Sequence, residues 1–171
     1  MLRPAFLLVA LCGAGCLPAH PALSHARVSV LRPDTFFLGE TRGHGVLHVL
    51  TRSPDSVRVV SQGALLPDGS TRLVQRITIG DAVRERVWTI VPDGPTAWTG
   101  SLSDAVGPVS IHADGPLLRI RYRTGPLTTI HQRLVLQPDG RTAENRLSAR
   151  VLGVPVARLT ETITRAAPPG R

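Results

Sequence analysis

The chain has 171 residues, 42% of them hydrophobic, and its 20 basic residues outnumber 12 acidic residues for a formal net charge of +8. This length accommodates one domain with a sizeable core, and the apolar fraction excludes an intrinsically disordered chain. The basic residues are all arginine and spread along the chain, with no helix-turn-helix and no aromatic RNA-binding motif. We therefore expect no nucleic-acid partner.

The arginine content has two interpretations. One is a genome whose composition favours arginine codons. The other is a surface that meets phosphate groups, such as anionic lipid headgroups. Arg119, Arg121 and Arg123 alternate with apolar residues and should form one stripe on a strand, which suits either plain solvent exposure or an anionic membrane surface.

Residues 1–26 are expected to be an export signal. Met1–Arg3 provides a positively charged start, and residues 5–15 form an apolar stretch too short to cross a bilayer. Residues 27–165 then form the folded domain, and residues 166–171 are expected to be a disordered tail.

Two cleavage sites compete in this segment. Gly13-Ala14-Gly15-Cys16 is similar to a bacterial lipobox, which would make Cys16 a lipidated first residue. Ordinary signal cleavage within residues 22–26 is the alternative, because Ser24-His25-Ala26 places small residues at the two required positions. We favour the lipobox and expect an exported, periplasmic protein that is membrane-anchored if Cys16 is acylated.

The cysteine count restricts the chemistry of the domain. Cys12 and Cys16 are the only cysteines, so the mature domain has no disulfide and no thiolate chemistry. His44 and His48 would share one face of a strand but lie too far apart to hold one metal ion. We expect neither a metal site nor a cofactor.

The domain is predicted to be all-β with little helix. Three Pro-Asp-Gly turns, at residues 67–69, 92–94 and 138–140, separate segments rich in β-formers. About eight to ten strands follow at roughly ten-residue spacing, which is typical of a sandwich or a closed antiparallel barrel. The expected strands are 46–52, 57–62, 71–79, 83–91, 96–101, 108–112, 117–124, 128–136, 142–152 and 155–165.

The segments before and between the first strands carry further predictions. Residues 32–38 read as a lead-in, with Phe36-Phe37-Leu38-Gly39 packing on the first strand or plugging one end. Gly43-His44-Gly45 is expected to be a flexible approach to the first strand. Ser53-Pro54-Asp55 is expected to turn the chain into the second.

Strand alternation places one polar residue on each of four apolar inward faces: Gln75, Gln132, Asn145 and Glu161. Burial without a partner would cost a few kcal/mol each, so these groups must pair with one another, with water, with an inward arginine or with a ligand. Arg86 is such an arginine if its strand turns Trp88 and Ile90 inward. Val83, Val87 and Val91 allow the opposite orientation, so both remain open.

The motifs Arg86-Val87-Trp88, Trp98-Thr99-Gly100, Asp104-Ala105-Val106-Gly107, Tyr122 and Asn145-Arg146 occur in an order that resembles an uncharacterised family of bacterial proteins. That family consists mostly of single-domain envelope lipoproteins of unknown function, and the likeness covers residues 36–165. It implies a lipocalin-like (calycin-type) β-barrel. The chain departs from the pattern at Trp98, at Ala105 and in its degraded lipobox, and the resemblance supplies no catalytic residue.

Our functional hypothesis is non-catalytic binding of a small apolar or amphipathic, lipid-like molecule in the bacterial envelope. Trp88, Trp98 and Tyr122 would line the cavity, although aromatic side chains also serve as core packing. Gln132, Asn145 and Glu161 would fix its polar end.

Two alternatives belong to other classes. The first is a structural or partner-binding envelope protein with a filled barrel. The second is an enzyme with Glu161 or Asp104 as general base. The non-catalytic interpretation of the same residues is that Glu161 forms a structural pair and that Asp104 caps its own turn. We assign no catalytic residue, and the sequence does not fix the oligomeric state.

Overall fold

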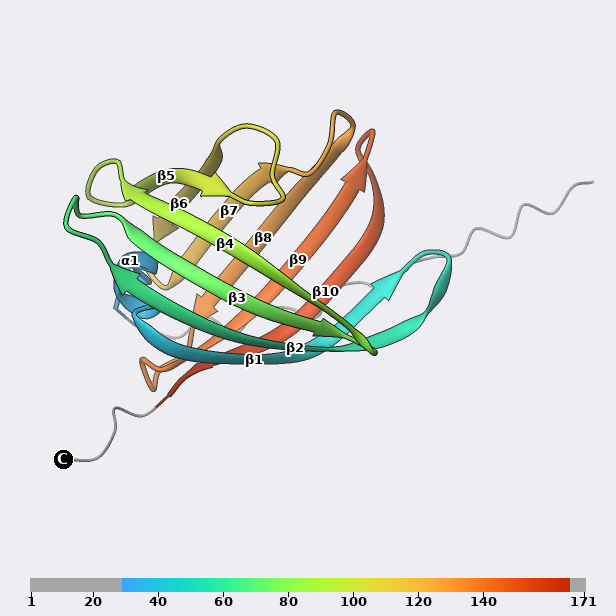
Figure 1. Ribbon diagram of the computed structural model, residues 1–171, viewed down its shortest axis with the longest axis horizontal. Helices are drawn as coiled ribbons and strands as arrows, with labels where there is room; N and C mark the ends of the chain where they lie inside the picture. Colours follow the sequence, from blue (N-terminus) through green and yellow to red (C-terminus); the bar gives the residue numbers. More distant parts are fainter. Residues whose placement is uncertain (1–28, 167–171) are drawn as a thin grey trace, which may run out of the picture.

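The computed structural model describes residues 29–166 and is a closed barrel of ten antiparallel strands (Figure 1). Each strand pairs with its sequence neighbours, and β1 pairs with β10 to complete the ring. The strands are β1 (Gly39–Val49), β2 (Arg52–Leu65), β3 (Thr71–Ile79), β4 (Ala82–Pro92), β5 (Ala97–Leu102), β6 (Val109–Asp114), β7 (Leu117–Arg123), β8 (Thr128–Leu136), β9 (Thr142–Val151) and β10 (Val154–Arg165).

The predicted all-β antiparallel barrel is confirmed. Closure pairs every strand on both sides and so removes the exposed sheet edges that favour aggregation. Within residues 29–166 no helix is both long and apolar enough to cross a membrane. The predicted export signal, Cys16 and most of the predicted tail lie outside the described residues.

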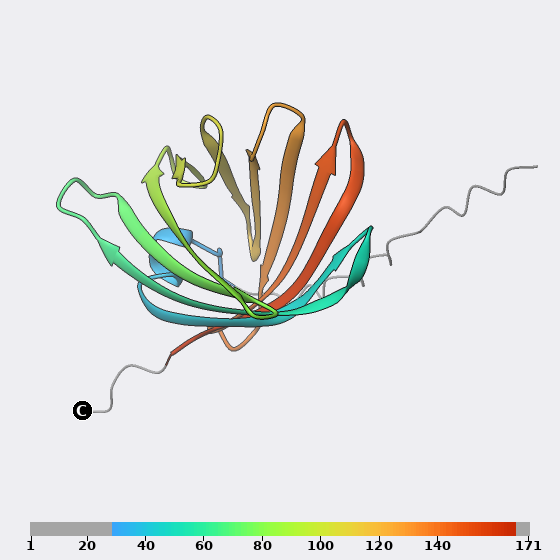
Figure 2. The same cartoon turned by 45° about the vertical axis from the view of Figure 1, so that its right-hand side comes forward.

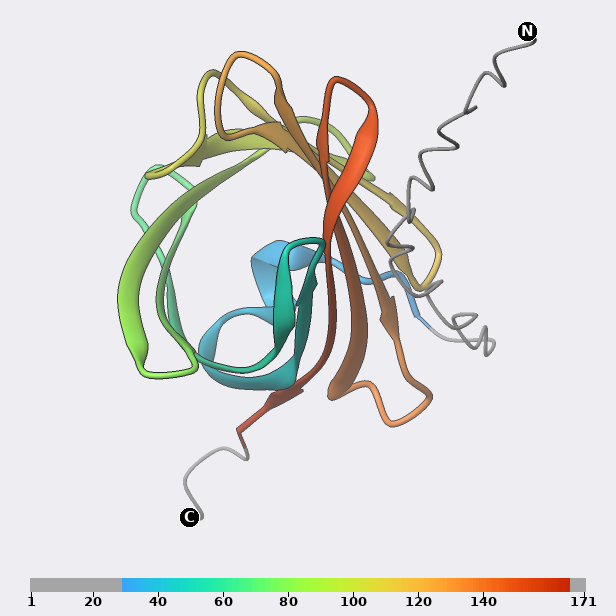
Figure 3. The same ribbon diagram turned by 90° about the vertical axis from the view of Figure 1, so that its right-hand side faces the viewer.

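One end of the barrel is closed by the lead-in segment. Helix α1 (Pro33–Phe36) sits at this end, and Phe36 and Phe37 meet edge to face with ring centroids 5.0 Å apart. The backbone N–H of Leu31 donates to the carbonyl of Gly115 at 3.0 Å, which ties the segment to the β6–β7 turn. Figure 3 looks into the barrel and shows α1 across its far end. Of the two placements expected for this segment, packing on the first strand or plugging one end, the structure has the plug.

The predicted turn at Ser53-Pro54-Asp55 is wrong. The chain reverses at Leu50 and Thr51, and Pro54 lies inside β2. The β1–β2 register shifts between Leu47 and Val49, so this stretch is irregular. Proline has no N–H to donate to the ladder, so a strand tolerates it where the pairing is irregular. The Gly43-His44-Gly45 segment is likewise part of β1 and not a flexible approach to it.

The main core fills the half of the barrel next to the plug. Leu118, Leu134 and Trp98 are fully buried there together with Leu31 and Phe36. A smaller cluster of valine, isoleucine and leucine side chains lies on the wall formed by β1, β2, β3 and β10. The interior is thus solid near α1, and the remaining volume lies toward the other end.

We expect Leu134→Ala to lower the free energy of unfolding by about 2–5 kcal/mol, because it leaves a cavity in the packed half of the barrel. The matched control is Leu65→Ala, since Leu65 is 60% exposed, and its effect should stay within about 0.5 kcal/mol. Urea unfolding followed by circular dichroism measures both. Equal losses would contradict the assignment of the core.

Candidate functional site

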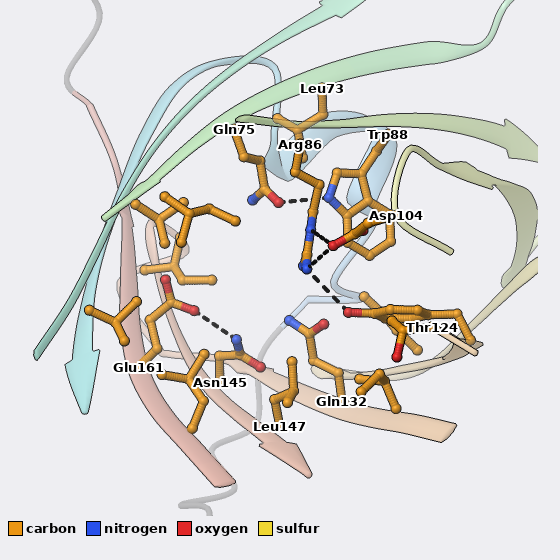
Figure 4. Close-up of a pocket in the computed structure, with 18 of the residues that line it drawn as sticks. Leu73, Gln75, Arg86, Trp88, Asp104, Thr124, Gln132, Asn145, Leu147 and Glu161 are labelled. Carbon is orange, nitrogen blue, oxygen red and sulfur yellow. Dashed lines mark hydrogen bonds and ion pairs between the residues drawn. The ribbon is translucent and has the colours of Figure 1, made fainter. Parts of the chain in front are cut away.

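The barrel encloses a cavity of about 430 Å³ whose wall is mostly apolar (Figure 4). Phe37 and Pro33 of the plug segment form its closed end. Arg84 and Thr124 line it next to the turns of the opposite end, which we call the open end. Nine of the ten strands, all except β5, contribute side chains to the lining, so the site exists only once the barrel has closed.

All four polar residues assigned to inward faces line this cavity: Gln75, Gln132, Asn145 and Glu161. They lie near the middle of their strands, between the packed plug half and the apolar wall of the open half. That part of the sequence analysis is confirmed. Whether these side chains contact a ligand stays a prediction.

Gln75 belongs to a hydrogen-bonded chain that crosses three strands. The indole N–H of Trp88 donates to Gln75 Oε1 at 2.7 Å, and Gln75 Nε2 donates to Ser61 Oγ at 3.2 Å. Both ends of the Gln75 amide are therefore engaged, which fixes its orientation and that of the indole. Ser61 is buried and was not identified from the sequence.

Arg86 faces inward, which settles the orientation of β4 in favour of Trp88 and Ile90. Its guanidinium donates to Asp104 Oδ2 at 2.6 and 3.1 Å and to the hydroxyl oxygen of Tyr122 at 3.4 Å. Asp104, which lies in the β5–β6 loop, therefore pairs with Arg86, whose side chain points into the barrel from β4. Burial raises the pKa of Tyr122 although the Arg86 charge opposes the shift, so the phenol stays protonated.

Glu161 and Asn145 are neighbours on β10 and β9 and form a buried pair. The Asn145 amide Nδ2 donates to Glu161 Oε2 at 2.8 Å. Burial raises the pKa of Glu161, against the opposing effects of the Asn145 hydrogen bond and the Arg86 charge. Asn145 Oδ1 is buried and has no hydrogen-bond partner among residues 29–166. An unpaired buried acceptor is costly, so a donor on a bound molecule would be stabilised there.

Gly43 of β1 leaves space for the Glu161 carboxylate, and Gly45 allows the backbones of β1 and β10 to approach closely. A Cβ on Gly43 would overlap Glu161 Oε1, and a Cβ on Gly45 would overlap the backbone oxygen of Thr160. Glycine inside a strand often marks such a close approach, so the Gly43-His44-Gly45 motif carried a usable signal. The sequence analysis missed it because it assigned the motif to a loop.

The three predicted aromatic residues divide between cavity and core. Trp88 and Tyr122 line the cavity and contact each other edge to face, with centroids 5.7 Å apart. Trp98 does not line it, and that expectation is wrong. Its ring packs with Leu31 in the core next to the plug, where the Arg32 guanidinium lies 5.1 Å from the ring centroid. The lead-in segment covers this position and so removes it from the cavity.

Two polar side chains of the lining take no part in these networks. The Gln132 amide has no hydrogen-bond partner, and the exposed Arg84 has no ion-pair partner, within the described part of the chain. Gln132 lies beside Asn145 in Figure 4. The described residues contain no group of three or more histidine, cysteine, aspartate or glutamate side chains that could hold a metal ion.

The closed ten-stranded antiparallel barrel, plugged at one end and hollow toward the other, is a lipocalin-like fold. Residues 10–165 match the model of the family described as protein of unknown function (DUF3833), and the chain belongs to that family. A search of curated proteins finds no match.

Two solved structures share this fold. An S-type phycobiliprotein lyase from Guillardia theta superposes with a TM-score of 0.63 at 9% identity, over 80% of this chain and 92% of the lyase. A protein of unknown function of the DUF3598 family from Nostoc punctiforme has a TM-score of 0.63 and 19% identity. That match covers 86% of this chain and 54% of the other protein. Both likenesses establish the fold alone.

A double-mutant cycle tests the contact between Gly43 and Glu161. We expect Gly43→Ala to lower the free energy of unfolding by about 1–3 kcal/mol, because the new methyl group displaces the carboxylate. In a Glu161→Ala background the same change should have almost no effect. Gly45→Ala is the control: its obstacle is backbone, so its effect should be equal in both backgrounds. A Gly43→Ala effect that survives Glu161→Ala would disprove the contact.

The raised pKa of Glu161 gives a pH dependence whose sign is fixed. The folded protein holds the Glu161 proton at pH values where the unfolded chain, near its ordinary value of 4.5, has released it. The contribution of Glu161 to the free energy of unfolding is therefore fully present below pH 4.5. It is lost as the pH rises through the pKa of the folded protein, by at most about 1.4 kcal/mol per pH unit.

Glu161→Gln should remove this dependence. Denaturant unfolding from pH 4 to 8 should show the wild type losing stability relative to the variant as the pH rises. A difference that is flat with pH, or that grows in favour of the wild type, would contradict the burial of a protonated carboxyl.

Proposed function

We propose that this protein binds a small amphipathic molecule in the barrel without transforming it. The observation that carries the proposal is the 430 Å³ cavity, which falls in the range of ligand sites and combines an apolar wall with a few polar groups at fixed positions. A filled barrel would leave no such volume. Burial of the apolar part of a ligand supplies affinity, and the polar groups supply orientation.

The distribution of polar groups indicates how such a ligand would lie. Aliphatic side chains of β1, β2, β3 and β10 form one wall of the open half, whereas Arg86, Asp104 and Tyr122 lie across the cavity. The free acceptor of Asn145 and the amide of Gln132 face the same space. A molecule with an apolar body and a hydrogen-bonding group that can donate suits this arrangement.

Both acidic side chains of the cavity already have partners. Asp104 is paired with Arg86, and Glu161 receives a hydrogen bond from Asn145. A carboxyl held by a neighbouring amide is typical of a structural pair, which favours binding over general-base catalysis. Glu161→Gln keeps the shape of the side chain, so it should leave ligand binding within about threefold of wild type.

We further propose that the protein acts in the bacterial envelope, exported by its first residues and anchored if Cys16 is acylated. The support is the apolar N-terminal segment and the restriction of cysteine to positions 12 and 16. Intact mass spectrometry of the natively exported protein tests this by reading the mature N-terminus and any acyl chain. The same preparation, extracted with organic solvent, reports copurifying small molecules. An unprocessed N-terminus would refute the location, and an empty cavity would count against the ligand.

We expect Ala149→Trp to abolish binding of the fluorescent probe 1-anilinonaphthalene-8-sulfonate, because its side chain would fill part of the cavity. Ala149 lines the cavity on β9, whereas its neighbour Ser148 does not. Ser148→Trp is therefore the matched control, and its probe affinity should stay within about threefold of wild type. Both variants should unfold near the wild-type temperature. Equal probe binding by Ala149→Trp and wild type would place the probe elsewhere and remove the support for a cavity ligand.

A further inference from the structure

Large apolar side chains stand exposed in the turns around the open end. They lie in or directly beside four neighbouring connections of the barrel: Leu50 in β1–β2, Val106 in β5–β6, Leu127 in β7–β8, and Leu152 in β9–β10 with Val154 at the start of β10. We call these five residues the apolar rim. Figure 2 shows the β7–β8, β9–β10 and β1–β2 turns on the side of the barrel away from α1.

Backbone hydrogen bonds join these turns into one arc. The N–H of Leu152 donates to the carbonyl of Leu127 at 3.1 Å, and that of Leu50 donates to the carbonyl of Val156 at 3.0 Å. The N–H of Val106 donates to the carbonyl of Arg123 at 2.7 Å, which brings the β5–β6 loop to the end of β7. The rim is therefore a single surface and not a set of scattered side chains.

The opposite end has different turn chemistry. Its connections after β2, β4 and β8 are the Pro-Asp-Gly turns, whose aspartates are exposed. Asp68 accepts from both the N–H and the hydroxyl of Ser70, and Asp139 closes its turn in the same manner. Leu65 and Val91 are exposed at that end, but each lies in a strand and not in a turn. The contrast therefore concerns the turns, which consist of turn formers at one end and contain leucine and valine at the other.

Leu152 shows that this difference is not explained by turn formation. Its φ is +49°, in the left-handed region that asparagine and glycine adopt readily and leucine does not. Its side chain is also 74% exposed, so it gains little from packing. A leucine that is unfavourable both for the turn and for solvation is best explained by something outside the chain that covers it.

A cluster of arginines lies on the outer surface directly beneath the rim. Arg123 on β7 and Arg150 on β9 flank Thr129 of β8, and Arg121 and Arg133 follow further along β7 and β8. We call these four exposed arginines the basic face. None of them makes an ion pair with any residue in the range 29–166.

Three of these arginines act on the charge state of His131. Partial burial lowers the pKa of His131, and the charges of Arg121, Arg150 and Arg133 lower it further. Arg150 donates a hydrogen bond to the carbonyl of Gly153 at 3.0 Å, but no carboxylate among residues 29–166 neutralises these arginines. Such positive charges next to exposed leucines form the pattern of proteins that bind anionic membrane interfaces, where the cations meet lipid phosphates and the apolar groups enter the headgroup boundary.

We propose that the apolar rim and the basic face dock the open end of the barrel on an anionic phospholipid membrane, so that an amphipathic ligand passes between the bilayer and the cavity. The docking itself stands on the rim and the arginines. The route of the ligand rests on the proposed function, because Arg84 and Thr124 place the cavity opening at this same end. An anionic lipid surface is favoured over an acidic protein because the exposed apolar groups belong to separate turns beside the arginines of the basic face.

Cosedimentation with vesicles tests the docking. The exported protein is used as purified, with Cys16→Ser in every variant so that acylation cannot contribute. Vesicles of phosphatidylcholine with 30% phosphatidylglycerol, ~100 nm across, are compared with pure phosphatidylcholine at low and high salt. We expect binding to the anionic vesicles that weakens at high salt.

Substitutions separate the two parts of the surface. Leu127→Asn with Leu152→Asn should weaken binding about tenfold or more, whereas Leu65→Asn at the plug end should not change it. Asparagine suits the left-handed backbone at position 152, so Leu152→Asn should unfold at a higher temperature than wild type while binding membranes less well. A merely structural role for Leu152 would predict the opposite change in stability.

Arg123→Gln with Arg150→Gln should weaken binding about tenfold and reduce its salt dependence. The control is Arg72→Gln with Arg76→Gln on the exposed face of β3, which should have little effect. Absence of binding, equal loss with Leu65→Asn, or equal loss with the β3 arginines would overturn the proposal. So would a change from dimer to monomer on replacing the rim leucines, because the rim would then be an interface between copies of the chain.

Probe binding in the absence of vesicles distinguishes this proposal from the ligand hypothesis. The rim and basic-face variants should bind the cavity probe as the wild type does. If the protein binds vesicles but not the probe, the ligand function is refuted and the membrane docking is supported. If it binds the probe but not vesicles, the docking is refuted and the ligand function is supported.

Discussion

The pairing of β1 with β10 is the constraint on which the structure depends, because it turns an open meander into a closed ring. The buried carboxyl of Glu161 lies at this seam, and Gly43 of β1 provides the space for it. Because β10 is the last strand, the seam forms only when the whole chain is in place. The cavity, its polar groups and the removal of sheet edges all follow from that one contact between the two ends of the domain.

The hollow half of the barrel results from the size of its inward side chains. Next to the plug, Trp98, Leu118 and Leu134 pack with the lead-in segment into a solid layer, and the cavity begins at Phe37 and Pro33. Toward the open end, inward positions such as Ala149 and Ala157 are too small to meet across the lumen. A ten-stranded ring is wide enough that small residues leave a void, so a binding site and a stable core coexist in one barrel.

The two ends of the barrel differ in the residues that form their turns. The plugged end carries turns built from proline, aspartate and glycine, which favour a defined backbone and solvation. At the open end Leu152 has an unfavourable backbone conformation, and Arg123 and Arg150, which form no ion pair with the described residues, lie on the neighbouring strands. Local stability is thus reduced where the cavity opens, a pattern expected when a surface has to meet a partner.

Local patterns in the sequence determined the all-β class, the strand count, the plug and the inward positions of Gln75, Gln132, Asn145 and Glu161, because strand alternation depends only on neighbouring residues. Tertiary structure alone decided which of these groups became partners. The pairing of Arg86 with Asp104, the fit of Glu161 against Gly43 and the removal of Trp98 from the cavity each join segments far apart in the chain. Such contacts depend on strand register and barrel closure, which no local pattern specifies.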